Sequence, residues 1–181
     1  GITLSDGAAV LLARQADGSM RDGQSLLDQV IAYGGTELQD HHVKEVLGIP
    51  DRQALIRVGE AVADRDVARC LTLVAEAMER GHDLRLVADG LVHLFRDLAV
   101  LYACPKPGRL VTGSPEELEE LAALARRFEG STLARIFDLM VLGAEQAIRS
   151  SYPETLLEMT LMRLCFVGAM LPNDTVIKLL K

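Results

Sequence analysis

Aromatic residues are scarce in this chain of 181 residues, where they make up 4% and tryptophan is absent. Chains rich in β-strands usually carry more aromatic and β-branched residues. Leucine and alanine are abundant instead, with 30 and 21 copies, and both lose little side-chain freedom in a helix. The composition therefore predicts an all-α protein with leucine-filled helix interfaces, and we find no sequence pattern typical of a strand.

The chain also lacks a run of basic residues, since 19 Lys and Arg stand against 26 Asp and Glu, a net charge of −7. An acidic protein repels the phosphate backbone, which argues against sequence-independent DNA binding by this chain. Its three cysteines, Cys70, Cys104 and Cys165, are odd in number and far apart. They fit neither a disulfide framework nor a zinc site, and we expect buried thiols of a cytosolic protein.

No long hydrophobic run and no secretory signal is found either. The most apolar stretch, residues 156–171, contains Glu158 and Arg163. It falls short of the roughly 20 apolar residues that a helix needs to span a bilayer. We therefore expect a soluble protein of the cytoplasm.

Three short helices are predicted in the first part of the chain. Ser5 and Ser19 are suitable N-cap residues for the first two helices. The third lies at about 40–47, and Gly48-Ile49-Pro50 ends it, because glycine favours the left-handed C-terminal cap and proline cannot continue a helix. These signals predict a small three-helix bundle over residues 1–48.

Longer helices follow, and the clearest start signal is Ser114-Pro115, with a capping serine, a proline in the first helical position and a glutamate two residues later. The last predicted helix is apolar on nearly every side, so we expect it to be the buried centre of a second bundle. We predict this larger bundle over 51–171, followed by a C-terminal tail at 172–181. Its expected helices are about 51–63, 66–80, 83–101, 115–130, 131–149 and 154–171.

Common catalytic motifs are missing. The sequence holds no GxxxxGK[ST] phosphate loop and no GxGxxG, HExxH or GxSxG motif. His41 and His42 are neighbours, so we expect them on different helix faces, unable to share a metal. His82 and His93 lack carboxylate or cysteine partners at ligand spacing. We interpret all four histidines as surface or packing residues, and we predict no metal site.

One short segment, Gly18-Ser19-Met20-Arg21-Asp22, indicates a ligand. Its arginine stands in the first turn of a capped helix, where the positive end of the helix dipole disfavours a cation. A bound phosphate would reverse that cost, because free backbone N–H groups and the guanidinium would both face it. The alternative is an arginine paired with Asp17 or Asp22, and the residues alone leave both interpretations open.

The same segment carries a resemblance. Residues 10–33, VLLARQADGSMRDGQSLLDQVIAY, resemble the lid domain of AAA+ ATPases and, more narrowly, the γ/τ subunit family of bacterial DNA polymerase III. The matching pattern is A-R-x-A-[DE]-G-S-x-R-D, then SLLDQ, then a helix that ends in V-L-G at 46–48. A second stretch, LEMTLMRL at 157–164, is similar to E-M-x-L-L-R near the end of the family's third domain. Gly23 departs from the pattern, because relatives usually have alanine there.

The resemblance implies that residues 1–48 are the lid and that Arg21 is the sensor-2 arginine facing the phosphates of ATP, with Ser19 and Met20 beside it. Residues 51–171 would be the collar that assembles with the delta and delta-prime subunits and further γ/τ copies. The family's Walker motifs, sensor 1, arginine finger and zinc cysteines have no counterpart in this sequence. The complete protein would bind ATP, Mg²⁺, the sliding clamp and primer–template DNA. We expect no catalytic residue and no ATP binding in this chain alone.

Two charged residues on the last predicted helix need partners. Glu158 and Arg163 lie about 140° apart at about 100° per residue, so they cannot pair with each other. Each either bonds within the chain, for instance to the helix bearing Arg149, or makes a contact between subunits in the collar.

Two alternatives to this assignment stay open at the level of sequence. One is the lid and oligomerisation domain of another AAA+ replication or recombination ATPase, because the Gly-Ser-x-Arg-Asp segment alone does not distinguish these families. The other is a helical scaffold domain that never binds nucleotide.

Overall fold

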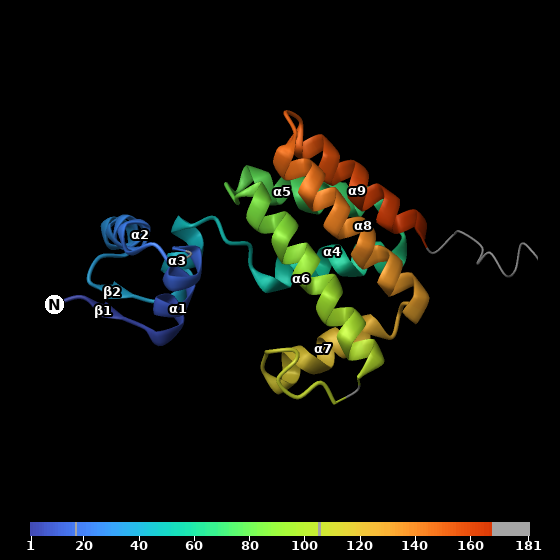
Figure 1. Ribbon diagram of the computed structural model, residues 1–181, viewed down its shortest axis with the longest axis horizontal. Coiled ribbons are helices and arrows are strands. Elements are labelled where there is room, and N and C mark those ends of the chain that lie inside the picture. Colours follow the sequence, from blue (N-terminus) through green and yellow to red (C-terminus); the bar gives the residue numbers. More distant parts are fainter. Residues whose placement is uncertain (17, 105, 168–181) are drawn as a thin grey trace, which may run out of the picture.

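The computed structural model describes residues 1–16, 18–104 and 106–167, which fold almost entirely into helices (Figure 1). This confirms the predicted all-α class. The smaller body holds α1 (Asp6–Gln15), α2 (Met20–Gly34) and α3 (Asp40–Val46). The larger body holds α4 (Arg52–Asp64), α5 (Val67–Glu79), α6 (Leu84–Ala103), α7 (Pro115–Ala125), α8 (Gly130–Arg149) and α9 (Pro153–Val167).

A short strand pairing in the smaller body was not predicted. β1 (Thr3–Leu4) and β2 (Glu37–Leu38) run parallel, with Leu4 opposite Leu38. The N–H of Ser5 then donates to the carbonyl of Leu38 at 3.0 Å, and Leu38 is fully buried. The expectation of no strand is wrong here, because a strand of two residues is too short to produce an alternating pattern.

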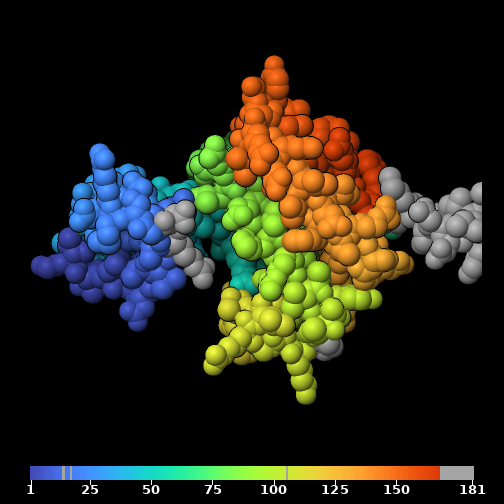
Figure 2. Space-filling model, viewed as in Figure 1, coloured from blue at the N-terminus to red at the C-terminus, as the bar shows by residue number. Residues whose placement is uncertain are grey.

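Each body has its own apolar core. The core of the smaller body consists of Ala8, Leu12, Val30, Leu38 and Val43, so α3 packs together with α1 and α2. The core of the larger body begins along the chain at Ile56. Figure 2 shows the two bodies as separate masses, and the smaller one lies at the left.

The centre of the larger body is α6 rather than the last helix. α6 packs against α4, α7 and α8, and it buries seven side chains that include Leu91, Phe95 and Leu98. α9 packs against α8, α5 and α4 but leaves Met159 40% and Phe166 52% exposed. The prediction of a central last helix is therefore wrong, because its apolar residues face both the core and the surface. Its expected continuation to 171 and the tail at 172–181 lie outside the described residues.

The junction between the bodies is built on Gly48. Its backbone has φ +64°, the left-handed conformation predicted for this glycine. The N–H of Ile49 donates to the carbonyl of Lys44 at 2.8 Å, as in a Schellman motif at the end of α3. The carbonyl of Gly48 also accepts the N–H of Asp83, the N-cap residue of α6, at 3.2 Å. The end of the smaller body is thereby bonded to the start of the central helix of the larger one.

We predict that Gly48→Ala lowers the free energy of unfolding. A Cβ at this position would lie 2.9 Å from the backbone N of Asp83 and 3.2 Å from the carbonyl of Gly81. The positive φ adds its own penalty, so a loss of about 1–3 kcal/mol is expected in urea denaturation. Gly81→Ala is the matched control, since Gly81 has φ +81° but nothing within 4 Å of the added carbon. An equal loss in both variants would contradict a role for the Asp83 contact.

Candidate functional site

The start of α2 has the geometry of a capped helix. Gly18 turns the chain with φ +81°, and Ser19 follows in an extended conformation. The Ser19 hydroxyl accepts the N–H of Asp22 at 3.3 Å, and the Ser19 carbonyl accepts the N–H of Gly23 at 3.0 Å. The predicted N-cap is therefore confirmed. Met20 and Arg21 lie in the first turn of the helix, and their N–H groups have no earlier helical carbonyl to pair with.

Arg21 lies exposed in this first turn, next to Met20, whose side chain is 78% exposed. Of its two possible acidic partners, Asp22 makes no ion pair with it, and Asp17 lies outside the described residues. The positive helix end opposes a cation here by about 0.3–1 kcal/mol. The described residues thus leave the guanidinium facing solvent, where it can contact an anion.

An apolar hollow of about 340 Å³ lies beside this turn, between α1 and α2. Ser19 and Met20 form part of its wall, and most of the remainder comes from leucines and alanines. Gly23 also lines it, and a Cβ there would come within 3.3 Å of the Cβ of Ala16. The sequence carried no signal for this hollow, because it depends on how closely two helices approach. The first turn of α2 thus places an exposed cation next to Met20, which lines the apolar hollow.

A second feature is the outer groove between α8 and α9. At one end a hollow of about 470 Å³ is lined by Arg135, Asp138, Leu139, Arg163, Phe166 and Val167. At the other end a hollow of about 330 Å³ is lined by Glu145, Gln146, Arg149, Ser150 and Leu156. Leu142, which lies in sequence between the α8 residues of these two sets, is 55% exposed. Figure 1 shows the two helices side by side along one edge of the larger body.

The two charged residues predicted on the last helix take different positions in α9. Arg163 is exposed and lines the groove, whereas Glu158 is half-buried. Among the described residues neither forms an ion pair, so of the two alternatives the ion pair within the chain is not seen there. The reason is that neither charge is fully buried, and partial hydration removes the need for a partner.

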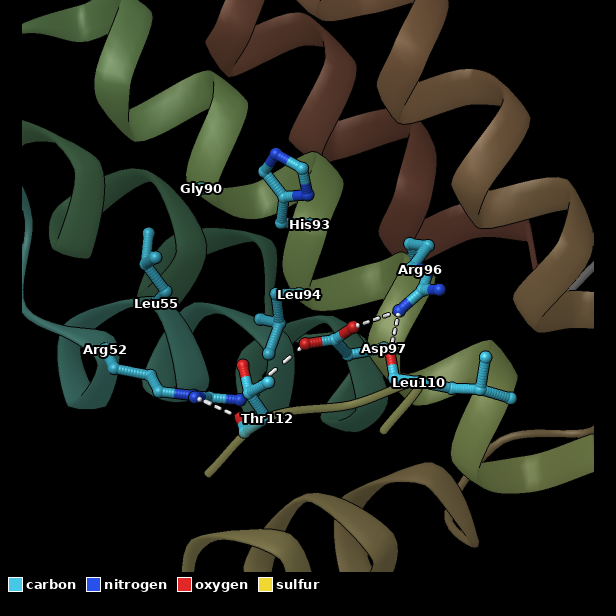
Figure 3. A pocket seen from close by; sticks show the side chains of 9 residues that line it. All are labelled: Arg52, Leu55, Gly90, His93, Leu94, Arg96, Asp97, Leu110 and Thr112. Carbon is cyan, nitrogen blue, oxygen red and sulfur yellow. Dashed lines mark hydrogen bonds and ion pairs between the residues drawn. The ribbon is translucent and has the colours of Figure 1, made fainter. Parts of the chain in front are cut away.

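A larger cleft of about 590 Å³ lies between α4, α6 and the segment before α7 (Figure 3). Arg52 donates to the carbonyl of Thr112 at 2.9 Å and pairs with Asp97 at 3.6 Å. Arg96 donates to Asp97 at 2.9 Å and to the carbonyl of Leu110 at 2.6 Å. Both guanidinium groups therefore hold the segment before α7 against the bundle through hydrogen bonds to its carbonyls, and we assign them a structural role.

The histidine and cysteine predictions need two corrections. The rings of His41 and His42 do not diverge, since their centroids lie 3.9 Å apart. The ring of His42 folds back so that its Nδ1 accepts the N–H of Gln39 at the start of α3, which brings it beside His41. Cys104 is exposed rather than buried, because it ends α6 at the surface.

The structure offers no metal site and no membrane segment within the described ranges. There, no group of three or more His, Cys, Asp or Glu side chains could hold a metal ion. No helix in that part of the chain combines the length and apolar character required to cross a membrane.

Comparisons with known proteins address both bodies. Residues 1–36 match the family model described as DNA polymerase III clamp loader subunit, ATPase lid domain. Residues 38–180 match the model for domain III of DNA polymerase III subunits gamma and tau. A solved structure, the DNA clamp loader delta protein of Bacillus subtilis, is similar in fold, with a TM-score of 0.53 and 15% identity over 91% of this chain and 51% of that chain.

Curated relatives bear the same family name. The DNA polymerase III subunit gamma/tau of Mycobacterium bovis is 30% identical over 172 residues, which cover 93% of this chain and 30% of the relative. The subunit tau of Salmonella typhimurium is 29% identical over 86% of this chain and 24% of its own length. The chain thus spans less than a third of the length of these relatives. With its lid segment and domain III both matched, the chain belongs to the gamma/tau subunit family of the DNA polymerase III clamp loader.

Proposed function

We propose that this chain is the lid and collar of an ATP-driven clamp loader in the bacterial cytoplasm, with the lid at 1–48 and the collar at 51–171. The observation that carries the proposal is Arg21, a solvent-facing guanidinium in the first turn of a capped helix, within the segment matched by the lid model. A bound phosphate would offset the unfavourable helix dipole at this position. Arg85 has the same position in α6, so the match of the lid model to residues 1–36 is what distinguishes Arg21.

The residues at the start of α2 fit a nucleotide. Arg21 would hold a phosphate, and the apolar hollow of about 340 Å³ bordered by Ser19 and Met20 would receive the base. ATP with Mg²⁺ would supply those phosphates, while the phosphate loop and metal ligands would belong to the family's ATPase module. One arginine and one helix end provide few contacts, so we expect no micromolar ATP binding by this chain alone.

The junction at Gly48 would pass movement of the lid to the collar. A rotation of the smaller body that displaces Gly48 would bend or break the bond between the Gly48 carbonyl and the N–H of Asp83. Asp83 caps α6, the central helix of the collar. The phosphate state sensed at Arg21 would thus reach the helix around which the collar is packed.

The groove between α8 and α9 is the surface that we assign to assembly. Leu139, Leu142 and Gln146 on α8 follow spacings of three and four residues, as do Met159, Arg163 and Phe166 on α9. Such spacing places a stripe on one face of each helix, which a helix of a neighbouring subunit could cover. The partners would be the delta, delta-prime and further gamma/tau subunits, with Arg163 and Glu158 at the edge of the contact. The sliding clamp and primer–template DNA would be bound by other parts of the complex.

We predict that Leu142→Glu in the complete subunit weakens assembly with the other clamp-loader subunits about thirtyfold or more, as the loss of a central contact of about 2 kcal/mol would. Leu110→Glu is the matched control, since Leu110 is 56% exposed against 55% for Leu142 and lies away from the groove. Assembly would be measured by co-purification and by titration of labelled subunits. Unchanged assembly of a folded Leu142→Glu variant would show that the collar uses another face.

A further inference from the structure

Two buried cysteines meet in the core of the larger body. Cys70 lies in α5 and Cys165 in α9, and their Sγ atoms are 3.6 Å apart although the residues are 95 positions apart in sequence. The exposed fractions of the two residues are 0% and 1%. α5 and α9 pack against each other in the upper part of the larger body in Figure 1. The fold thus brings two thiols into direct contact.

This contact is close to the geometry of a bond. A disulfide has an S–S distance of about 2.05 Å, so the two sulfur atoms need to approach by only about 1.5 Å. Small rotations of both side chains can share such a movement. Both helices are held by the surrounding core, so the thiols stay in contact as long as the bundle is folded.

Cys165, although 1% exposed, borders a hollow that opens at the surface. It lines a surface hollow of about 150 Å³, together with Arg65, Arg127 and Phe128. A hydroperoxide as small as hydrogen peroxide fits in that space, since one water occupies about 30 Å³. Cys70 does not line the hollow and lies behind Cys165. An oxidant entering the hollow therefore meets Cys165 first.

The electrostatic setting supports the same order of reaction. With Cys70 as donor, the hydrogen bond between the thiols lowers the pKa of Cys165. The same bond and burial raise the pKa of Cys70. The thiolate is the nucleophilic form of cysteine, so Cys165 is the better attacking group. Arg127 at the hollow is paired with Asp64, and Glu129 lines the hollow too, so the hydrogen bond from Cys70 is the main cause that lowers the pKa of Cys165.

We propose that Cys165 and Cys70 form an oxidant-sensitive pair that a small hydroperoxide converts into an intramolecular disulfide. The Cys165 thiolate attacks one peroxide oxygen, the O–O bond breaks, and the other oxygen leaves with a proton as water or an alcohol. The sulfenic acid formed on Cys165 is then attacked by Cys70, which releases water and closes the S–S bond. Two thiols and one hydroperoxide thus give one disulfide, one water and one further water or alcohol.

The disulfide would tie α5 to α9 across the core. A cross-link between residues so far apart restricts the unfolded chain strongly, so oxidation should stabilise the bundle. In a cytosolic protein such a bond is expected to be transient and to respond to oxidants. It would stiffen α9, the helix whose outer face borders the groove with α8.

The test uses the whole chain with hydrogen peroxide, followed by alkylation of the remaining thiols under denaturing conditions and mass spectrometry. We expect a loss of two hydrogen atoms, a linked pair of peptides containing Cys70 and Cys165, and a higher melting temperature that dithiothreitol reverses. Cys104→Ser is the matched control, because Cys104 is exposed and unpaired. Its removal should leave the cross-link unchanged, whereas a bulky maleimide applied to the native protein should label Cys104 alone.

Cys70→Ala provides a second measurement. Without the resolving thiol, peroxide should produce a sulfenic acid on Cys165 that dimedone traps, and the melting temperature should not rise. The wild-type cross-link can be scored even if this variant folds poorly. If peroxide oxidises only Cys104, and the linked peptides form only after the protein is unfolded, the pair is core packing and the proposal is overturned.

Discussion

Arg21→Ala in the complete subunit is expected to lower ATP-dependent clamp loading about tenfold to a hundredfold, because a charge-assisted contact contributes about 1.5–3 kcal/mol. The same change should alter the free energy of unfolding by no more than about 0.5 kcal/mol, as is usual for surface sites. Arg21 is exposed and makes no ion pair with Asp22, so the fold loses little with it. Loading by the reconstituted complex and urea denaturation provide the two measurements.

The chain offers a close control for this experiment. Arg85 is also exposed, and it is the second residue of α6 as Arg21 is the second residue of α2. Both helices are capped by the preceding serine or aspartate. Arg85→Ala should leave loading unchanged, and Arg21→Lys should restore it only in part, because an ammonium does not reproduce the planar fork of arginine. Normal loading with Arg21→Ala would remove the sensor-2 assignment.

Helix starts could be predicted from sequence because their signals are local. Ser114 accepts the N–H of Glu117 at 3.2 Å, and the Glu117 carboxylate accepts the N–H of Ser114 at 2.9 Å. The caps at Ser19 and Asp83 are equally local. The end of α7 differs from its prediction. The helix ends at Ala125 and not near 130, and Phe128, which follows it, is buried in the core.

Features that depend on packing could not be predicted. The apolar residues of α9 indicated a fully buried helix, yet Met159 and Phe166 face outward, since burial depends on how many neighbours a helix has. The contact between Cys70 and Cys165 joins helices far apart in the chain. Local patterns carry no information on such contacts.

The candidate site also combines features that follow from local sequence with features that depend on packing. Arg21 could be identified because a cation in a first helical turn conflicts with the dipole, which is a local argument. The apolar hollow beside it required the packing of α1 on α2. The angle between Glu158 and Arg163 on the helix follows from their spacing. Their exposure does not follow from sequence, and it is this exposure that lets water hydrate both charges without a partner in the chain.

Another contact that only the fold defines lies between α8 and α9. Gly143 is buried in the middle of α8, and a Cβ there would lie 2.3 Å from both Cγ2 and Oγ1 of Thr160 on α9. Thr160 is itself 4% exposed, and its hydroxyl donates to the carbonyl of Leu156 at 2.7 Å. The threonine therefore occupies the space that the missing side chain leaves, and this lets the two helices approach closely.

Gly143→Val is expected to lower the free energy of unfolding by about 3 kcal/mol or more, a large part of the stability of about 5–15 kcal/mol that is typical of a domain. Gly143→Ala should lower the free energy of unfolding less, because replacing glycine by alanine in a helix contributes up to about 1 kcal/mol of helix propensity. Thr160→Ala should relieve part of either loss, so the double variant should be more stable than the sum of the single losses predicts. Gly23→Ala in α2 is the control, since it has the same gain in helix propensity and its added carbon would lie 3.3 Å from the Cβ of Ala16, so it should leave stability unchanged or raise it by up to about 1 kcal/mol. Urea denaturation of the whole chain measures every variant. A Gly143→Val variant as stable as wild type would contradict the close approach of α8 and α9.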